Sequence, residues 1–185
     1  MSAQANAIPF TRDRTLVGVA LFIGSESLFF LGVVIAYLVL REQGLATAKL
    51  QLDVGRTAIF STLLFASSAT VGLATARRSR AWLGLTALLG AAFLAGQAAE
   101  YARLLGAGLR PGSELFGTTF FTLTGLHAVH VVVGLVLLVT LFAASGARPR
   151  RVGHAAWEGI AMYWHFVDAV WVVLFSVVYL GTLIG

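Results

Sequence analysis

Five ionisable side chains stand within long apolar stretches of this sequence, where they could do chemistry. They are Glu26, His127, His130, His165 and Asp168. Charged groups are expensive to place in hydrocarbon, so such residues normally face protein or trapped water. Imidazole and carboxyl groups in this setting can ligate a metal, carry protons, or form hydrogen bonds between helices.

Their spacing indicates which of them share a helix face. His127 and His130 are three residues apart, and so are His165 and Asp168. Residues at this spacing lie on one side of an α-helix. Glu158 precedes His165 by seven residues and falls on nearly the same side. We therefore expect one hydrogen-bonded polar cluster between helices, formed by Glu26, His127, His130, Glu158, His165 and Asp168.

The three chemistries are not equally supported by this arrangement. The sequence has no cysteine, which excludes thiolate metal sites, disulfides and covalently attached c-type haem. Two histidines three apart on one helix do not place axial ligands on opposite faces of a haem. We therefore expect no metal and no cofactor in this chain. For the histidines we favour hydrogen bonding between helices, whereas for Glu26 proton transfer and a structural role both remain open.

Two further sets of residues point to helix packing. Gln97 and Glu100 lie one turn apart near the end of an apolar run, and we expect an interface pair in which Glu100 contacts Arg103 or a partner's loop. Tryptophan recurs every seven residues, which predicts an aromatic packing edge at Trp157, Trp164 and Trp171. Several glycines are interpreted as sites of close helix approach: Gly18, Gly24, Gly32, Gly125 and Gly134.

Composition defines the class of element that carries these residues. The 185 residues are 58% hydrophobic and only 11% charged, which is too apolar for a soluble domain of this size. The formal charge of +5 comes from short basic clusters between apolar runs, so nucleic-acid binding is a poor interpretation. About 20 apolar residues cross a bilayer as a helix. The sequence predicts an all-α integral membrane bundle, a single membrane domain over 1–185, with five transmembrane helices at about 15–40, 57–76, 81–104, 117–144 and 155–183.

Basic residues predict the orientation of these spans. Eight lie in the N-terminal segment and in alternate connections, namely Arg12, Arg14, Arg77, Arg78, Arg80, Arg148, Arg150 and Arg151. Five lie on the other side, namely Arg41, Lys49, Arg56, Arg103 and Arg110. The positive-inside rule then places the N-terminus inside and the C-terminus outside. The first apolar run is too long for a cleaved signal peptide, so we expect the N-terminus to be retained.

Four segments in combination resemble a known family. SESLFFLG (25–32), GQAAEY (96–101), GLHAVHVVVG (125–134) and YWHFVDAVWVVLF (163–175) are similar, in this order and one per span, to signature segments of subunit III of haem-copper terminal oxidases, the cytochrome c oxidase subunit 3 family. The resemblance covers about residues 15–184. Longer members have seven helices, so it implies the short five-helix bacterial form, which lacks the first two. Ala128 departs from the glycine that is common between the two histidines.

The resemblance implies a function without a catalytic centre in this chain. It implies an accessory subunit that stabilises the catalytic subunit and supports proton uptake while oxygen is reduced to water in aerobic electron transport. Haem and copper are then expected in the partner subunits, with subunit I as the main contact and subunit II as a further one. Bound phospholipid and a multi-pass location in the bacterial cytoplasmic membrane are also implied.

Within the resemblance, Glu26 matches a glutamate that reacts with hydrophobic carbodiimides. The electron donor, cytochrome c or quinol, stays open. Two alternatives also remain: a five-helix partner of a nitric oxide reductase, and a stand-alone proton-conducting membrane protein.

Overall fold

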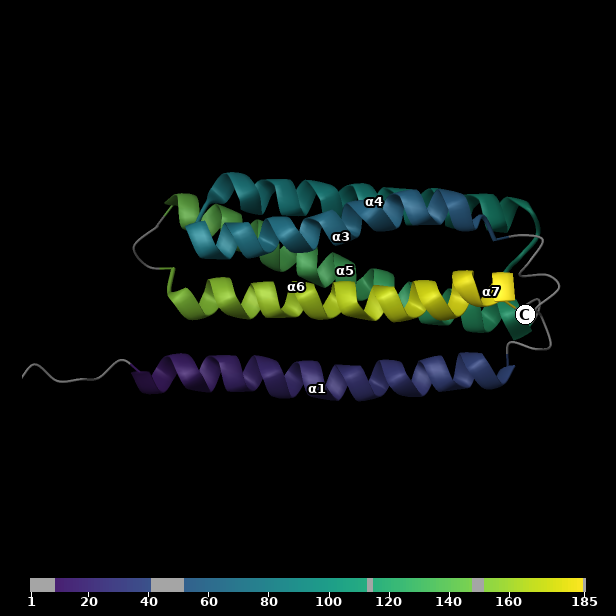
Figure 1. The fold of residues 1–185 in the computed structure, drawn as a ribbon, viewed down its shortest axis with the longest axis horizontal. Helices are drawn as coiled ribbons and strands as arrows, with labels where there is room; N and C mark the ends of the chain where they lie inside the picture. Colours follow the sequence, from purple (N-terminus) through teal and green to yellow (C-terminus); the bar gives the residue numbers. More distant parts are fainter. Residues whose placement is uncertain (1–8, 41–51, 113–114, 148–151, 185) are drawn as a thin grey trace, which may run out of the picture.

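The residues that the structure describes form five long helices, which run alternately in opposite directions (Figure 1). The computed structural model describes residues 9–40, 52–112, 115–147 and 152–184. The long helices are α1 (Pro9–Leu40), α3 (Val54–Arg77), α4 (Arg80–Gly106), α5 (Leu115–Ala147) and α6 (His154–Phe175). After α6 the chain continues as a short π-helix, η3 (Ser176–Leu180), and a single turn, α7 (Gly181–Ile184). Within these ranges there is no β-strand.

The first four predicted spans fall on α1, α3, α4 and α5, and the fifth extends over α6, η3 and part of α7. Five apolar stretches of 24 to 32 residues are long enough to cross a membrane. Each exceeds the roughly 20 residues that a crossing requires. The prediction of an all-α bundle with five transmembrane helices is therefore confirmed. The single domain and the inside position of the N-terminus stay predictions.

Tight capping at both ends of α3 makes α3 and α4 an antiparallel hairpin. Asp53 caps the start, because its Oδ1 accepts a hydrogen bond from the Arg56 backbone N–H at 2.9 Å. At the other end Arg78 adopts a left-handed conformation with φ 46°, and the Ser79 N–H donates to the Ala74 carbonyl at 3.1 Å. This pattern closes a helix and reverses the chain. Consequently α4 begins at Arg80, with only Arg78 and Ser79 between the two helices.

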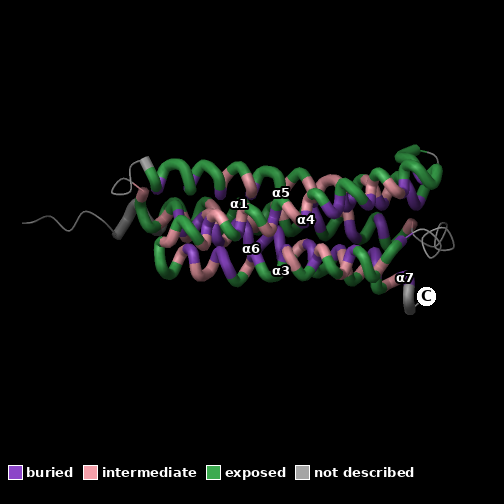
Figure 2. Tube along the Cα trace, turned by 90° about the horizontal axis from the view of Figure 1, so that it is seen from above, coloured by how far each residue is buried: buried purple, intermediate pink, exposed green. Residues whose placement is uncertain are grey.

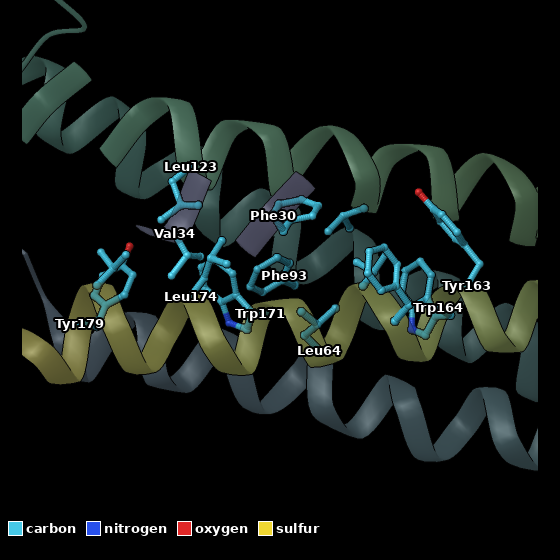
Figure 3. Packing of buried hydrophobic residues seen from close by; sticks show 14 of the residues in the cluster. Phe30, Val34, Leu64, Phe93, Leu123, Tyr163, Trp164, Trp171, Leu174 and Tyr179 are labelled. Carbon is cyan, nitrogen blue, oxygen red and sulfur yellow. The ribbon is translucent and has the colours of Figure 1, made fainter. Parts of the chain in front are cut away.

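Helix α6 packs against α1, α3 and α5, and its tryptophans lie in the core (Figures 1 and 3). Trp164 and Trp171 are fully buried, and Trp157 is nearly so. The indole N–H of Trp164 donates to Ser67 Oγ, and that of Trp171 donates to Ser61 Oγ, each at 2.8 Å. The predicted aromatic edge is therefore a packing edge. It also supplies two of the hydrogen bonds that join α6 to α3.

Two glycines make room for the Trp164 ring. A Cβ atom on Gly90 of α4 would lie 2.6 Å from Trp164, and a Cβ atom on Gly134 of α5 would lie 2.8 Å from it. Real Cβ atoms are not found this close to other heavy atoms. Gly134 is thus a site of close approach, as predicted, and Trp164 fills the space between α4 and α5.

The same prediction is wrong for Gly18, Gly24 and Gly32 of α1. No described atom lies within 4 Å of a Cβ built at any of them. The physical reason is that α1 packs on one side only, mainly against α5 and α6. Its other side is exposed, with Leu21 and Leu28 each 71% accessible. Figure 2 shows this division, with buried residues toward the bundle interior and exposed residues on the outer faces. Gly125 has only an ordinary contact, with Tyr101.

The glycine contacts predict opposite effects of the same substitution at two positions. Gly134→Ala should destabilise the bundle by about 1–3 kcal/mol, because the added methyl group overlaps the Trp164 ring. Gly32→Ala is the matched control, and it should be neutral or slightly stabilising because alanine favours helix. Denaturation in detergent, followed by tryptophan fluorescence, measures both. Equal stability of the two variants would contradict the conclusion that the Trp164 ring occupies the space beside Gly134.

Candidate functional site

The structure brings Glu26 of α1 and His130 of α5 into contact. Glu26 Oε2 lies 3.2 Å from His130 Nε2. The side chains are only 23% and 16% accessible, so the pair is largely enclosed by protein. Both residues were expected in the polar cluster, and they are 104 positions apart in the sequence.

The second ring nitrogen of His130 determines how this pair shares its protons. His130 Nδ1 lies 2.8 Å from the Leu126 carbonyl oxygen, which can only accept a hydrogen bond. Nδ1 must therefore carry a proton. Nε2 then either accepts a hydrogen bond from a protonated Glu26, or carries a second proton and faces a carboxylate. Both forms are neutral overall, and the first leaves no ionised group in a region of low dielectric constant.

Aromatic residues hold His130 in place. The Tyr163 hydroxyl of α6 donates to the His130 backbone carbonyl at 3.1 Å. The Phe30 ring of α1 meets the imidazole edge-on, with ring centres 4.9 Å apart, and also packs edge-on against Phe166. Figure 3 shows Phe30 and Tyr163 in the buried core. Helices α1, α5 and α6 therefore meet around His130.

His165 and Asp168 lie away from this pair, on the side of α6 that faces α3. His165 is exposed, and a 2.6 Å hydrogen bond joins its Nδ1 to Ser68 Oγ. Asp168 is buried, and neither of its carboxyl oxygens has a hydrogen-bond partner among the described residues. These two residues share a helix face, as predicted, but they face α3 rather than α1 or α5.

Glu158 has its own partner at the start of α6. Its Oε1 lies 2.8 Å from His154 Nδ1, one turn earlier. The single cluster expected from the sequence is therefore wrong as a geometric prediction. Glu26 and His130 meet at the α1–α5 contact, and His165 and Asp168 lie at the α3–α6 contact. Glu158 pairs within α6. Spacing defines a face within one helix, but it does not define how neighbouring helices are rotated.

His127 points into the bundle interior, away from Glu26. It is 1% accessible and stacks on the Trp171 ring, with centres 4.9 Å apart and planes at 25°. The edge of the Phe93 ring lies against it, at 6.1 Å between centres. Neither imidazole nitrogen has a hydrogen-bond partner in the part of the chain that the structure describes. His127 therefore acts here as an aromatic core residue.

Of the interface pair expected near the end of α4, Glu100 makes its expected contact with Arg103, whereas the Gln97 amide nitrogen has no partner among the described residues. Glu100 is buried, and it accepts a hydrogen bond from Arg103 Nε at 3.0 Å with a second one from the same guanidinium. Gln97 is also buried, but its Nε2 has no partner within the described ranges. Tyr101 reaches α5 instead, where its hydroxyl lies 2.6 Å from Thr124 Oγ1. Glu100 is thus neutralised within α4.

The sequence reasoning missed the hydroxyl residues of α3. Ser61, Ser67 and Ser68 are the partners of Trp171, Trp164 and His165, respectively. Their signal was present, because serines in the middle of an apolar span need a hydrogen-bond partner. Among the described residues there is no group of three or more His, Asp or Glu side chains placed to hold a metal ion.

These observations define a class of protein. Five apolar helices surround buried polar contacts, and the chain is a multi-pass membrane protein of all-α type. Residues 50–182 match the family described as cytochrome c oxidase subunit III. The chain belongs to this family.

Relatives with similar sequences extend over nearly the whole chain. Cytochrome c oxidase subunit 3 of Corynebacterium diphtheriae is 36% identical over 193 residues, which span 97% of this chain and 94% of the relative. The subunit of the same name from Synechocystis is 38% identical over 180 residues, or 91% and 76% of the two chains. Cytochrome bo(3) ubiquinol oxidase subunit 3 of Pseudomonas aeruginosa is 32% identical, covering 90% and 85%.

The Glu26–His130 geometry predicts different outcomes for two substitutions of one residue. Glu26→Gln keeps a group that can donate to His130 Nε2, so its stability should stay close to that of the wild type. Glu26→Ala removes the contact and should destabilise the bundle by about 1 kcal/mol. Ser25→Ala is the control, since in the described part of the chain the Ser25 hydroxyl donates to the Phe22 carbonyl of its own helix.

Denaturation in detergent compares the three variants. A loss in Glu26→Gln as large as that in Glu26→Ala would show that the pair needs an ionised carboxylate, against the neutral form favoured above.

Proposed function

We propose that this chain is an accessory, non-catalytic subunit III of a haem-copper respiratory oxidase. In this role it stabilises the catalytic subunit and supports its proton uptake while oxygen is reduced to water. Its main contact is subunit I, with subunit II as a further partner. Haem and copper belong to those partners.

One observation carries this proposal, namely the match to oxidase subunits over nearly the full chain. The named relatives belong to oxidases of two kinds, one that takes electrons from cytochrome c and one from ubiquinol. A subunit that recurs beside different electron donors is expected to serve the part of the reaction they have in common. That common part is oxygen reduction and proton uptake in the catalytic subunit.

The described polar contacts fit a supporting role. Glu26, His130 and His165 each bond to a neighbouring helix, so each contributes to helix packing. Such contacts are worth about 1 kcal/mol in a membrane protein. The exposed apolar face of α1, with Leu21, Leu28 and Val39 each 71% accessible, is suited to contact lipid or a partner subunit.

We further propose an orientation in the bacterial cytoplasmic membrane. The start of α1, the α3–α4 turn and the start of α6 lie at the same end of the bundle (Figure 1). That end carries Arg14, Arg77, Arg78 and Arg80 in the described residues. The positive-inside rule makes it the cytoplasmic end. The named relatives, all from bacteria, support the choice of membrane.

Bound phospholipid is a further part of the proposal. A groove of about 250 Å³ runs between α1 and α6, with an almost entirely apolar lining that includes Phe30, Val34, Phe166 and Val173. Its shape and chemistry are suited to an acyl chain.

Co-purification tests the proposed function. A tagged chain isolated from its native membranes in mild detergent should bring with it a large subunit that carries haem and consumes oxygen. The same chain produced in a host that lacks the partner subunits is the control, and it should show no Soret band and no stoichiometric copper.

Two results would contradict the proposal. One is tight haem or copper in the control chain, which disappears on changing His127 or His165. The other is a native complex that reduces nitric oxide and not oxygen, which would favour the reductase alternative.

A further inference from the structure

A second polar site lies between α1, α3 and α6, apart from the Glu26–His130 pair. A groove of about 620 Å³ opens there. Its polar lining consists of Thr75, Arg78, His154, Glu158 and His165, while Leu16, Ala161 and Met162 are among its apolar walls. Three of its titratable residues, His154, Glu158 and His165, come from one face of α6.

These residues form a line from the helix start toward the bundle centre. His154 and Glu158 contact each other at 2.8 Å near the beginning of α6. His165 follows at about 16 Å from His154 along the helix axis, since each residue rises about 1.5 Å. The His165 ring is exposed, and its Nδ1 hydrogen bonds to Ser68 Oγ at 2.6 Å. A polar route thus leads from the groove mouth to Ser68.

Asp168 lies just beyond the end of this line. The residue is only 5% accessible, and within the described chain neither carboxyl oxygen has a hydrogen-bond partner. The Ser68 hydroxyl is close enough to act on the Asp168 carboxyl, but its 2.6 Å hydrogen bond is made to His165. Ser68 therefore lies between His165 and Asp168. A buried carboxyl without a partner is costly unless it is protonated or reached by water. This observation is independent of the groove.

We propose that Asp168 takes up protons from water in this groove, by way of His165 and Ser68. Water in the groove connects the His154–Glu158 pair with Nε2 of the exposed His165. When Nε2 takes up a proton, the proton on Nδ1 passes to Ser68 Oγ, and the Ser68 hydroxyl proton passes to the Asp168 carboxylate. One proton enters at Nε2 and one arrives at Asp168. Ser68 is restored, and His165 changes from its Nδ1–H to its Nε2–H tautomer, which a turn of the exposed ring or proton exchange with water in the groove resets.

The charged side chains around the groove favour the entry of protons at its mouth, near the start of α6. Arg78, directly after α3, contributes a permanently charged side chain to the groove lining, and α1 contributes the apolar Leu16. The guanidinium of Arg78 and the His154–Glu158 pair make this end of the groove polar, so water can enter it there. The proposal concerns side chains of this chain alone, so it does not depend on which oxidase subunits join it.

Gly72 offers a way to block this route without disturbing the core. It lines the groove one turn from Ser68, and no described atom lies within 4 Å of a Cβ built on it. Gly72→Phe should therefore fill the groove between Glu158 and His165. Gly32→Phe is the matched control, because its Cβ also meets no described atom and Gly32 lies on the outer face of α1.

The experiment is infrared spectroscopy of the full chain in lipid nanodiscs during a switch from H₂O to D₂O. Labelling with ¹³C-aspartate marks only Asp13, Asp53 and Asp168, of which Asp168 alone lies deep in a span. Its protonated carbonyl band should therefore be recognised without any substitution at Asp168. Deuterium should reach it readily in the wild type and in Gly32→Phe.

In Gly72→Phe the exchange of deuterium into the Asp168 carboxyl should slow several-fold. Ser68→Ala should slow the same exchange. The unlabelled band of Glu26 should keep its wild-type exchange rate in both variants. An unchanged Asp168 rate in Gly72→Phe would overturn the proposal. So would the absence of a protonated Asp168 band at every pH at which the chain stays folded.

Discussion

The arrangement of this bundle depends on how α6 places Trp164 in a medium without water. The ring needs space, which Gly90 of α4 and Gly134 of α5 provide. Its N–H needs an acceptor, which Ser67 of α3 provides. An unsatisfied polar group in hydrocarbon is costly, so the two requirements together fix the rotation of α6 against three helices. Two turns later along α6, the indole N–H of Trp171 likewise finds its acceptor on α3, in Ser61.

Once α6 is held in this rotation, its remaining polar residues are directed to different sides. Tyr163 turns toward α5 and supports the carbonyl of His130, next to Glu26. His165 and Asp168 turn toward α3 and Ser68. The bundle therefore holds two separate polar sites at similar depth, one enclosed by protein and one beside an open groove. An accessory subunit with this construction can be stabilised by one site and exchange protons at the other.

Much of the architecture was predictable because it depends on local properties of the chain. The number of helices follows from the length of each apolar run, and antiparallel neighbours follow from short connections such as the one at Arg78. The pairing of Glu26 with a histidine was also expected, because a carboxyl at that depth needs a polar partner.

The choice of partners was not predictable in the same way. His127 and His130 lie on one face, yet only His130 reaches Glu26, because α1 covers just one edge of α5. The sequence predicts a face relative to its own helix axis, whereas the contact depends on the rotation of both helices. For the same reason the sequence predicts a packing site at Gly32, although Gly32 lies on the exposed side of α1.

A double-mutant cycle between Trp164 and Ser67 tests the central role of α6 most directly. Trp164→Phe, Ser67→Ala and the double variant are compared in reversible denaturation of the full chain in detergent. A hydrogen bond between helices in a membrane protein contributes about 0.6–2 kcal/mol, and the coupling energy of this pair should fall in that range. A coupling energy near zero, with the two single effects simply adding, would contradict the claim that this hydrogen bond sets the position of α6.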